Sequence, residues 1–480
     1  MKRYQLWIAI AVLILPILAR TLWFYHGISI RPPVQTPDYE SFAIPRPPVS
    51  TPQPEKVTAA AGKIMVLDYI HGNQFEPSEL ETLTIALTSR GARVEFDDGN
   101  LSLSTRLKYA SAYVVISPTY AFTTEEIVQV QRFVSRGGRL LVFTDPTRGL
   151  AGWDWYTGNM YMTPDVNAAN ALLAPFDITF TNDYLYNLIE NEGNYRHVQY
   201  WQFGKNALAK GLTQVVFYSA HSVNTDTGTA LILGDENTLS SRTDSGGDPA
   251  TGSGLAAAAI SEDENVLAIG DFTFLMPPYN QVADNGLLLS RIADFLLGGA
   301  RTHELADFPF VFDRPVYLLP TGEIQLNTDL LSPVAYLQSA LQTTNTPLYI
   351  SQDPLAKGDR LILGLLTPSE DLKPFLEPFN LGLDDSSTIT IPGFGKVNRS
   401  GIGLMLYQTS KTGNTLILLT EYPEDLPTLI NLLASGDLSS CVIQENIGVC
   451  SVVYGGGYYG YEEPYTEEPA PTKEPAPVAP

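Results

Sequence analysis

The chain has 480 residues, a length that allows roughly two to four domains and a large buried core. Lys and Arg number 29 against 52 Asp and Glu, and the formal net charge of −23 argues against binding to a phosphate backbone. We therefore expect no nucleic-acid partner. The presence of two cysteines excludes a cysteine-rich disulfide scaffold and a four-cysteine zinc site.

Residues 1–30 are predicted to be a membrane anchor. Lys2 and Arg3 precede an apolar run from Leu6 to Tyr25, close to the ~20 residues that cross a bilayer as a helix. A cleaved signal peptide is the alternative, because the uninterrupted apolar core also has signal-peptide length. Residues 17–19 lack the small residue that a signal peptidase prefers, which favours an uncleaved, single-pass anchor in the cell membrane. Both interpretations place the body on the extracytoplasmic side, since the two cations stay inside.

Two segments are expected to lie outside the folded body. Residues 31–55 are dense in proline and carry no hydrophobic period, which predicts a linker of polyproline II type. Residues 454–480 begin with Gly and Tyr and continue as a Pro- and Glu-rich tail. This tail cannot bury enough apolar surface to fold, so we expect it to be disordered.

Between these segments, apolar runs of strand length alternate with helical periods. Residues 63–68 have the pattern of a buried strand, and 78–90 carry apolar residues at helical spacing. Further strands are predicted at 93–96, 112–117, 139–144 and 266–270, and further helices at 124–135 and 285–297. This βαβ alternation predicts an α/β fold with a doubly wound, mostly parallel sheet over residues 56–300.

Three motifs in this domain carry a family resemblance. They are Asp68-Tyr-Ile-His71-Gly-Asn73 after the first strand, Thr123-Thr-Glu-Glu126 at a helix start, and Ile269-Gly-Asp271 with Asp284-Asn285 downstream. Together they resemble an uncharacterised bacterial envelope family with a class I glutamine-amidotransferase-like domain, related to auxiliary subunits of gliding-motility-type ABC transporters. The resemblance implies an amidotransferase-like fold and an ABC permease as a membrane partner.

The same resemblance argues against glutaminase chemistry. Active amidotransferases place a cysteine on the turn between a strand and a helix, where the helix N-terminus favours the thiolate. The matching turn after Ser117 contains no cysteine, because the two cysteines lie far downstream at positions 441 and 450. We therefore expect no amidotransferase nucleophile and assign no catalytic residue and no cofactor.

Six polar residues near predicted strand ends form a candidate ligand crevice, because ligands bind at the carboxyl ends of parallel strands in such sheets. They are Asp68, His71, Asn73, Asp145, His221 and Asp271. Asp68 and His71, three residues apart, suit a metal or an oriented general base, and the alternative is that they brace their loop. No second His lies nearby, so no metal site is assigned. For Asp145 and Asp271 the alternative is an N-cap or loop-bracing role.

The stretch 150–220 interrupts the sheet pattern with many Trp and Tyr residues. Aromatic rings can stack on sugars, so a glycan ligand is one hypothesis. The other is a hydrophobic insertion packed over the sheet. Residues 301–453 are predicted to form a second, smaller α/β domain, in which two segments (361–372 and 416–426) repeat a buried strand followed by a helix start.

Cys441 and Cys450 flank a segment in which Asn446 and Gly448 suit a turn between two short strands. Outside the cytoplasm this arrangement predicts a disulfide across a hairpin, and two buried free thiols are the alternative.

Two functions of different classes follow from these observations. The first is a membrane-anchored, extracytoplasmic, non-catalytic binding or accessory protein of an ABC-type transport system, held in the lipid bilayer through Leu6 to Tyr25. The alternative is an envelope or extracellular hydrolase that uses Asp68 and His71.

Overall fold

The computed structural model describes residues 2–25, 62–243, 249–353, 357–383 and 387–452. The chain divides into two units, residues 1–48 and 49–480, and each is described by itself. The predicted Pro-rich linker (31–55) and the predicted tail (454–480) lie outside the described residues.

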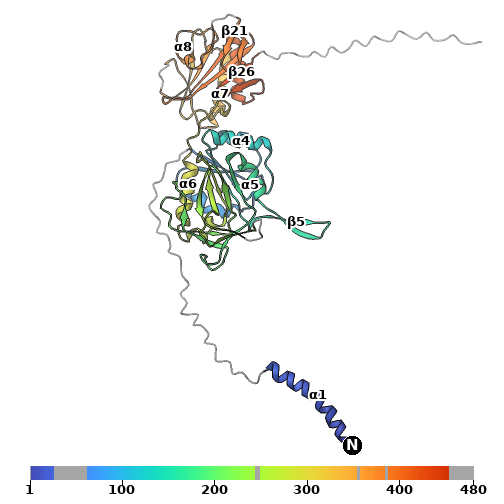
Figure 1. Ribbon diagram of the computed structural model, residues 1–480. Coiled ribbons are helices and arrows are strands. Elements are labelled where there is room, and N and C mark those ends of the chain that lie inside the picture. Colours follow the sequence, from blue (N-terminus) through green and yellow to red (C-terminus); the bar gives the residue numbers. More distant parts are fainter. Residues whose placement is uncertain (1, 26–61, 244–248, 354–356, 384–386, 453–480) are drawn as a thin grey trace, which may run out of the picture. The chain divides into compact units, whose positions relative to one another are not determined.

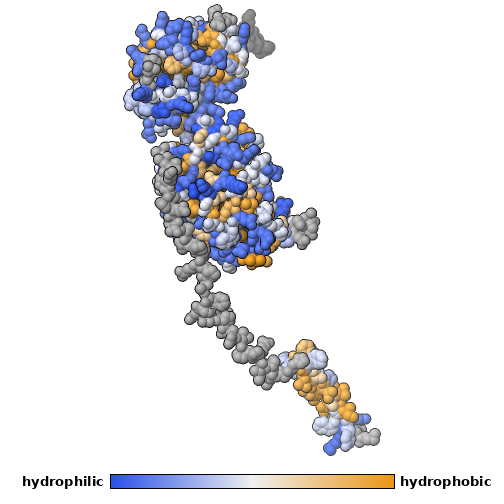
Figure 2. Space-filling view, turned by 60° about the vertical axis from the view of Figure 1, so that its left-hand side comes forward, coloured by the Kyte–Doolittle hydropathy of each residue, from blue (hydrophilic) through white to orange (hydrophobic). Residues whose placement is uncertain are grey.

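The first unit contains the helix α1 (Lys2–Tyr25), whose 24 residues span ~36 Å at ~1.5 Å per residue and so exceed the ~30 Å hydrocarbon core of a bilayer. Its apolar side chains are exposed along most of its length, and the helix is mainly orange in Figure 2. It is long and apolar enough to cross a membrane, a property that signal sequences share.

The second unit begins with a ten-stranded sheet in which five neighbouring strands are parallel, in the order β17-β4-β3-β1-β2. These strands are β1 (Ile64–Asp68), β2 (Arg93–Asp97), β3 (Ala112–Ile116), β4 (Arg139–Phe143) and β17 (Val266–Ile269). The sheet continues beyond β17 through antiparallel strands. Those strands are β16 (Ala256–Ile260), β13 (Thr229–Leu233), β10 (Gln202–Phe203), β12 (Val223–Thr225) and β7 (Ile178–Phe180). The predicted α/β class is confirmed, and the antiparallel extension was not foreseen.

Both faces of this sheet are covered, because alternate strand residues point to opposite sides. Met65 and Leu67 pack into one apolar cluster with α2 (Glu81–Thr88) and α6 (Asn285–Leu297). Val66, between them, packs into another with α3 (Leu103–Tyr109), α4 (Thr124–Ser135) and α5 (Val166–Leu173). Strands buried on both faces read as continuous apolar runs, which is why the sequence signal was clear.

The aromatic stretch 150–220 forms several short strands. Some of them pack in the body of the protein, and one hairpin projects from it. The packed strands are β8 (Leu185–Asn187), β9 (His197–Tyr200) and β11 (Val215–Tyr218). Beyond the stretch, β14 (Thr238–Thr243) pairs with β8 and with β15 (Pro249–Thr251). Tyr200 in β9 is fully buried, as the hypothesis of a packed insertion requires. The hairpin of β5 (Leu150–Asp154) and β6 (Asn159–Thr163) instead projects away from the sheet in Figure 1, with Trp153 exposed.

The chain then builds a seven-stranded sheet with the order β19-β18-β20-β24-β23-β26-β25. The strands are β18 (Val316–Pro320), β19 (Leu348–Ile350), β20 (Asp359–Leu365), β23 (Ile402–Gln408), β24 (Thr415–Thr420), β25 (Cys441–Gln444) and β26 (Ile447–Ser451). One face packs against α7 (Thr328–Gln342) and α9 (Leu426–Ser435), and the other against α8 (Lys373–Leu376) and the hairpin β21 (Thr388–Ile391)–β22 (Gly395–Asn398). This sheet-rich second region is confirmed.

Short 3-10 helices complete the described elements. They are η1 (Pro77–Leu80), η2 (Ala174–Phe176), η3 (Thr273–Leu275), η4 (Tyr279–Gln281), η5 (Leu305–Asp307), η6 (Glu377–Phe379) and η7 (Pro423–Asp425).

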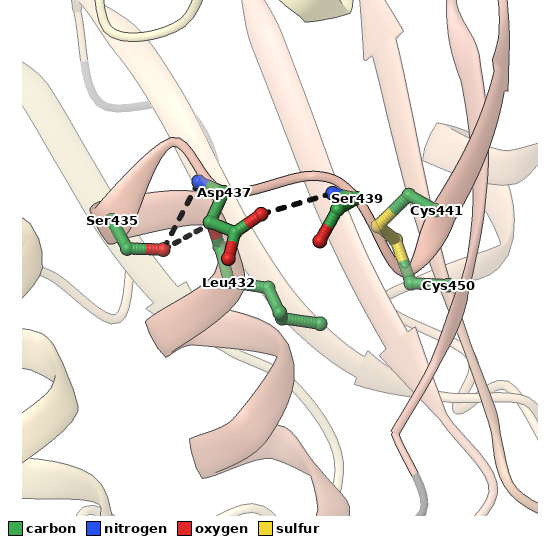
Figure 3. Close-up of a disulfide and its surroundings, with 6 residues drawn as sticks. All are labelled: Leu432, Ser435, Asp437, Ser439, Cys441 and Cys450. Carbon is green, nitrogen blue, oxygen red and sulfur yellow. Dashed lines mark hydrogen bonds between the residues drawn. A yellow bond between two sulfur atoms is a disulfide. The ribbon is translucent and has the colours of Figure 1, made fainter.

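The predicted disulfide between Cys441 and Cys450 is confirmed. The two residues stand directly opposite in the register of β25 and β26 (Figure 3). The chain enters this hairpin from α9 through a turn in which Asp437 accepts a hydrogen bond from the backbone N–H of Ser439 at 3.2 Å, while its own N–H donates to the hydroxyl of Ser435 at 3.1 Å. The bridge therefore joins the last two strands of the second sheet.

Candidate functional site

Asp68, His71 and Asn73 form one network at the carboxyl end of β1. The fully buried carboxylate of Asp68 accepts hydrogen bonds from Nδ1 of His71, at 2.9 and 3.0 Å, and from Nδ2 of Asn73, at 2.5 Å. Oδ1 of Asn73 in turn accepts the backbone N–H of Ile116 at 2.7 Å. The loop after β1 is thereby tied to the end of β3.

A second carboxylate faces the other side of the His71 ring. Nε2 of His71 lies 3.5 Å from Oε1 of Glu126, a residue in the first turn of α4. Oε2 of Glu126 accepts the backbone N–H and the hydroxyl of Thr123, both at 2.7 Å, and so completes a capping box. The Thr-x-x-Glu pattern marked the start of this helix in the sequence, but nothing in it indicated the contact with His71.

The imidazole of His71 is enclosed on its flat side as well. It stacks on Phe122 with a centroid separation of 3.7 Å and an interplanar angle of 22°, and its side chain is 7% exposed. Burial opposes the charge on His71, but the hydrogen bond and charge of Asp68 and the charge of Glu126 outweigh it, so the pKa of His71 is raised. The pKa of Glu126 is lowered: burial opposes this, but the hydrogen bonds from Thr123 and the charge of His71 prevail.

This geometry favours the doubly protonated imidazolium, in which each N–H is directed at a carboxylate. A general base needs a ring nitrogen with a free lone pair within reach of a substrate. His71 offers none, so the network suits bracing of the loop better than proton transfer.

Asp145 and Asp271 form a second group, at the ends of β4 and β17. Both share Thr273, which donates its hydroxyl to Oδ2 of Asp145 at 2.9 Å and its backbone N–H to Oδ1 of Asp271 at 2.8 Å. Asp145 also accepts from Thr147, and Asp271 accepts the backbone N–H of Tyr218 at 2.7 Å. Burial, and next the charge of Asp145, raise the pKa of Asp271 well above its usual value.

His221 joins this second group through Asp165, a residue that the sequence interpretation missed. Nε2 of His221 lies 3.3 Å from Oδ1 of Asp165, whose Oδ2 accepts the backbone N–H of Asp145 at 2.7 Å. Asp165 is 20 residues downstream of Asp145, just before α5, and no local pattern marks it as a partner of either residue.

The six candidate residues therefore divide into two hydrogen-bonded groups, and within the described part of the chain no direct hydrogen bond joins them. Arg148 connects their surroundings. Its guanidinium pairs with Glu79 at 2.8 Å, its Nη1 donates to the backbone oxygen of Gln74 at 3.4 Å, and its charge interacts with Asp145 and Asp271.

Four buried polar atoms near these strand ends have no hydrogen-bond partner among the described residues. They are Oδ2 of Asp97, which lies opposite Asp68 at the end of β2, Oγ of Ser117, Oγ1 of Thr144 and Nδ1 of His221. Ser117 begins the turn that lacks the amidotransferase cysteine, and its φ of 45° lies in the left-handed region. Among the described residues, its buried hydroxyl makes no hydrogen bond to a basic side chain that could activate it. Over the described ranges, no cluster of three or more His, Cys, Asp or Glu side chains is suited to a metal ion.

No protein-family model matches the chain, and no curated protein matches it. Similar solved structures include the mmIFT52 N-terminal domain, at 13% identity and a TM-score of 0.38, over 50% of this chain and 99% of that one. They also include a ThuA-like protein from Bacteroides uniformis (10% identity, TM-score 0.27, 52% of this chain and 95% of that one). A third is a ThuA-like protein from Parabacteroides merdae (10% identity, TM-score 0.25, 49% and 90%).

Proposed function

We propose that this chain is a membrane-anchored, extracytoplasmic accessory protein whose body binds a partner and catalyses no reaction. The observation that supports this is the closed network around His71. Each ring nitrogen faces a carboxylate, the ring is stacked on Phe122, and the side chain is 7% exposed. A hydrolase built on Asp68 and His71 would have to displace Glu126 from Nε2 of His71 and deprotonate a ring whose raised pKa both carboxylates support.

The location is argued from the two ends of the described chain. The helix α1 has the length and composition of a membrane span, and Lys2 and Arg3 precede its apolar run. The bridge between Cys441 and Cys450 is the kind of bond that persists in oxidising compartments. The proposed partner is the permease of an ABC-type transporter, on the basis of the sequence resemblance.

Membrane topology is tested with the full-length protein in cells. The chain should stay in the membrane pellet after carbonate extraction, and protease added to intact spheroplasts should remove the body. A body that is protected until lysis contradicts the extracytoplasmic location. A mature N-terminus beyond residue 19 contradicts the anchor, because it shows that the segment was cleaved.

Absence of catalysis is tested with the purified full-length protein and chromogenic esters, amides, phosphoesters and glycosides. No turnover is expected. The hydrolase would be favoured instead if the protein turned over a substrate and His71→Ala abolished this activity without changing the melting temperature. The control His303→Ala should then keep the activity. Photo-crosslinking from the body in cells should give an adduct with an ABC permease, and adducts with only other classes of protein contradict the proposed partner.

A further inference from the structure

The β5–β6 hairpin presents an apolar face that no described residue covers. Residues directly opposite in an antiparallel pair share a face, and the register places Trp153 opposite Met160 and Ala151 opposite Met162. All four side chains are exposed. A two-stranded hairpin is at best marginally stable alone in water, and an uncovered apolar face adds to that weakness. The hairpin therefore has the features of an element that is completed by a partner.

The tip of the hairpin extends this face. Trp155 is 88% exposed and Tyr156 is fully exposed. Together with Trp153 they line a shallow, open concavity of about 450 Å³, to which Asp154, Thr157 and Asn159 also contribute. In Figure 1 the labelled β5 projects beyond the rest of its domain. The tip can therefore reach a surface before the remainder of the sheet does.

The charges of the hairpin restrict the kind of partner. Residues 150–163 contain no Lys, Arg, His or Glu, and Asp154 is their single ionisable acid. Its carboxylate already accepts the hydroxyl of Thr157 at 2.8 Å and the backbone N–H groups of Tyr156 and Thr157 at 2.8 and 3.3 Å. Because both oxygens of this one carboxylate already accept hydrogen bonds, the hairpin offers no unengaged carboxylate to hold sugar hydroxyls, which disfavours a glycan. Trp and Tyr are the side chains that favour the interface between lipid and water.

We infer that the β5–β6 hairpin docks on an electrically neutral lipid surface, by inserting Trp153, Trp155, Tyr156 and the neighbouring methionines into its interfacial layer. The inference rests on the proposed anchoring, because α1 would hold the body beside such a surface. The 36 residues from 26 to 61 separate the two and reach at most ~130 Å at ~3.6 Å per residue. Tethering raises the effective concentration of lipid, so a weak insertion suffices. A chain with a net charge of −23 is repelled by anionic lipid, which points to zwitterionic headgroups.

The inference is tested on a chain that begins at residue 55. The buried members of all four apolar clusters lie between Met65 and Val452, so the body does not depend on α1 for its core. With phosphatidylcholine vesicles at about millimolar lipid, the effective concentration that a tether would supply, this body should float with the lipid, and brominated acyl chains should quench its tryptophan emission. The variant Trp153→Ser/Trp155→Ser/Tyr156→Ser should lose about tenfold in bound fraction, as expected for an interfacial contact without its aromatic side chains.

The matched control is Trp201→Ser, because Trp201 is 51% exposed, close to the 50% of Trp153, but lies outside the hairpin. Vesicle binding should survive this substitution. Absence of binding, equal binding by the triple variant, or equal loss in the control overturns the inference. If the body forms a dimer in the absence of vesicles and the triple substitution dissociates it, the face binds a second copy of the chain. If the body binds to glycan arrays and the triple substitution abolishes this binding, the face binds sugars. Because α1 is absent, the result is independent of whether the anchor exists, which the extraction experiment decides.

Discussion

Replacement of His71 by Ala is the most direct test of the bracing role. It would leave the fully buried carboxylate of Asp68 with Asn73 as its remaining side-chain hydrogen-bond donor. Loss of one partner of a buried pair typically costs about 3–5 kcal/mol. At an unfolding entropy of ~2.1 cal/mol/K per residue, a folding unit of ~390 residues loses about 1.2 °C of melting temperature per kcal/mol, so we expect a decrease of roughly 4–6 °C.

The effect should depend on pH with a definite sign. The pKa of His71 is raised in the folded protein, so the charged ring stabilises the fold fully below its unfolded pKa of about 6.5. This contribution is lost as the pH rises through the folded pKa. The difference in melting temperature between the wild type and His71→Ala should therefore be larger at about pH 6 than at about pH 9.

Differential scanning calorimetry at both pH values measures these differences. The double variant Asp68→Asn/His71→Ala should recover part of the loss, because it no longer buries an uncompensated charge. Glu126→Gln should lower the melting temperature less than His71→Ala does, since the amide oxygen of the new glutamine can still cap α4. Equal melting temperatures for the wild type and His71→Ala, or a difference that grows with pH, would refute the bracing role.

Three further predictions concern the rest of the body. The variant Cys441→Ser/Cys450→Ser opens a loop whose ends are nine positions apart, and its free energy of unfolding should fall by about 2.7 kcal/mol on the chain-entropy estimate. Two alkylated thiols in the unreduced native protein would contradict the bridge. In urea titrations, Gly270→Ala should lower the free energy of unfolding by about 1–3 kcal/mol, because its new Cβ would collide with the backbone of His221. The control Gly254→Ala places its Cβ in open space and should unfold at the same urea concentration as the wild type. The purified full-length protein should release no ammonia from glutamine, and release that persists in the double Cys variant would contradict the absence of an amidotransferase site.

The sequence by itself determined the elements whose signals are local. Strands such as β1 and β3 are buried on both faces, so each appears as an uninterrupted apolar run regardless of what lies beside it. Both ends of the helix α4 can be located from the sequence, because a capping box at Thr123 marks its start and the Gly137-Gly138 pair follows its end. The disulfide needed only two cysteines and a short turn between them.

The tertiary structure alone decided how the polar residues are grouped. Glu126 reaches His71 across 55 positions of sequence, and Asp165 reaches His221 across 56, because the loops that follow neighbouring strands bring distant helix starts together. The tertiary structure alone also decided that Trp153 is exposed. The sequence shows only that the residue is aromatic, and an aromatic residue occurs both in strands that pack on a sheet and in strands that project from it. Local patterns report what each segment can form, whereas partners and exposure depend on which other segments occupy the surrounding space, and that is settled only when the whole chain packs.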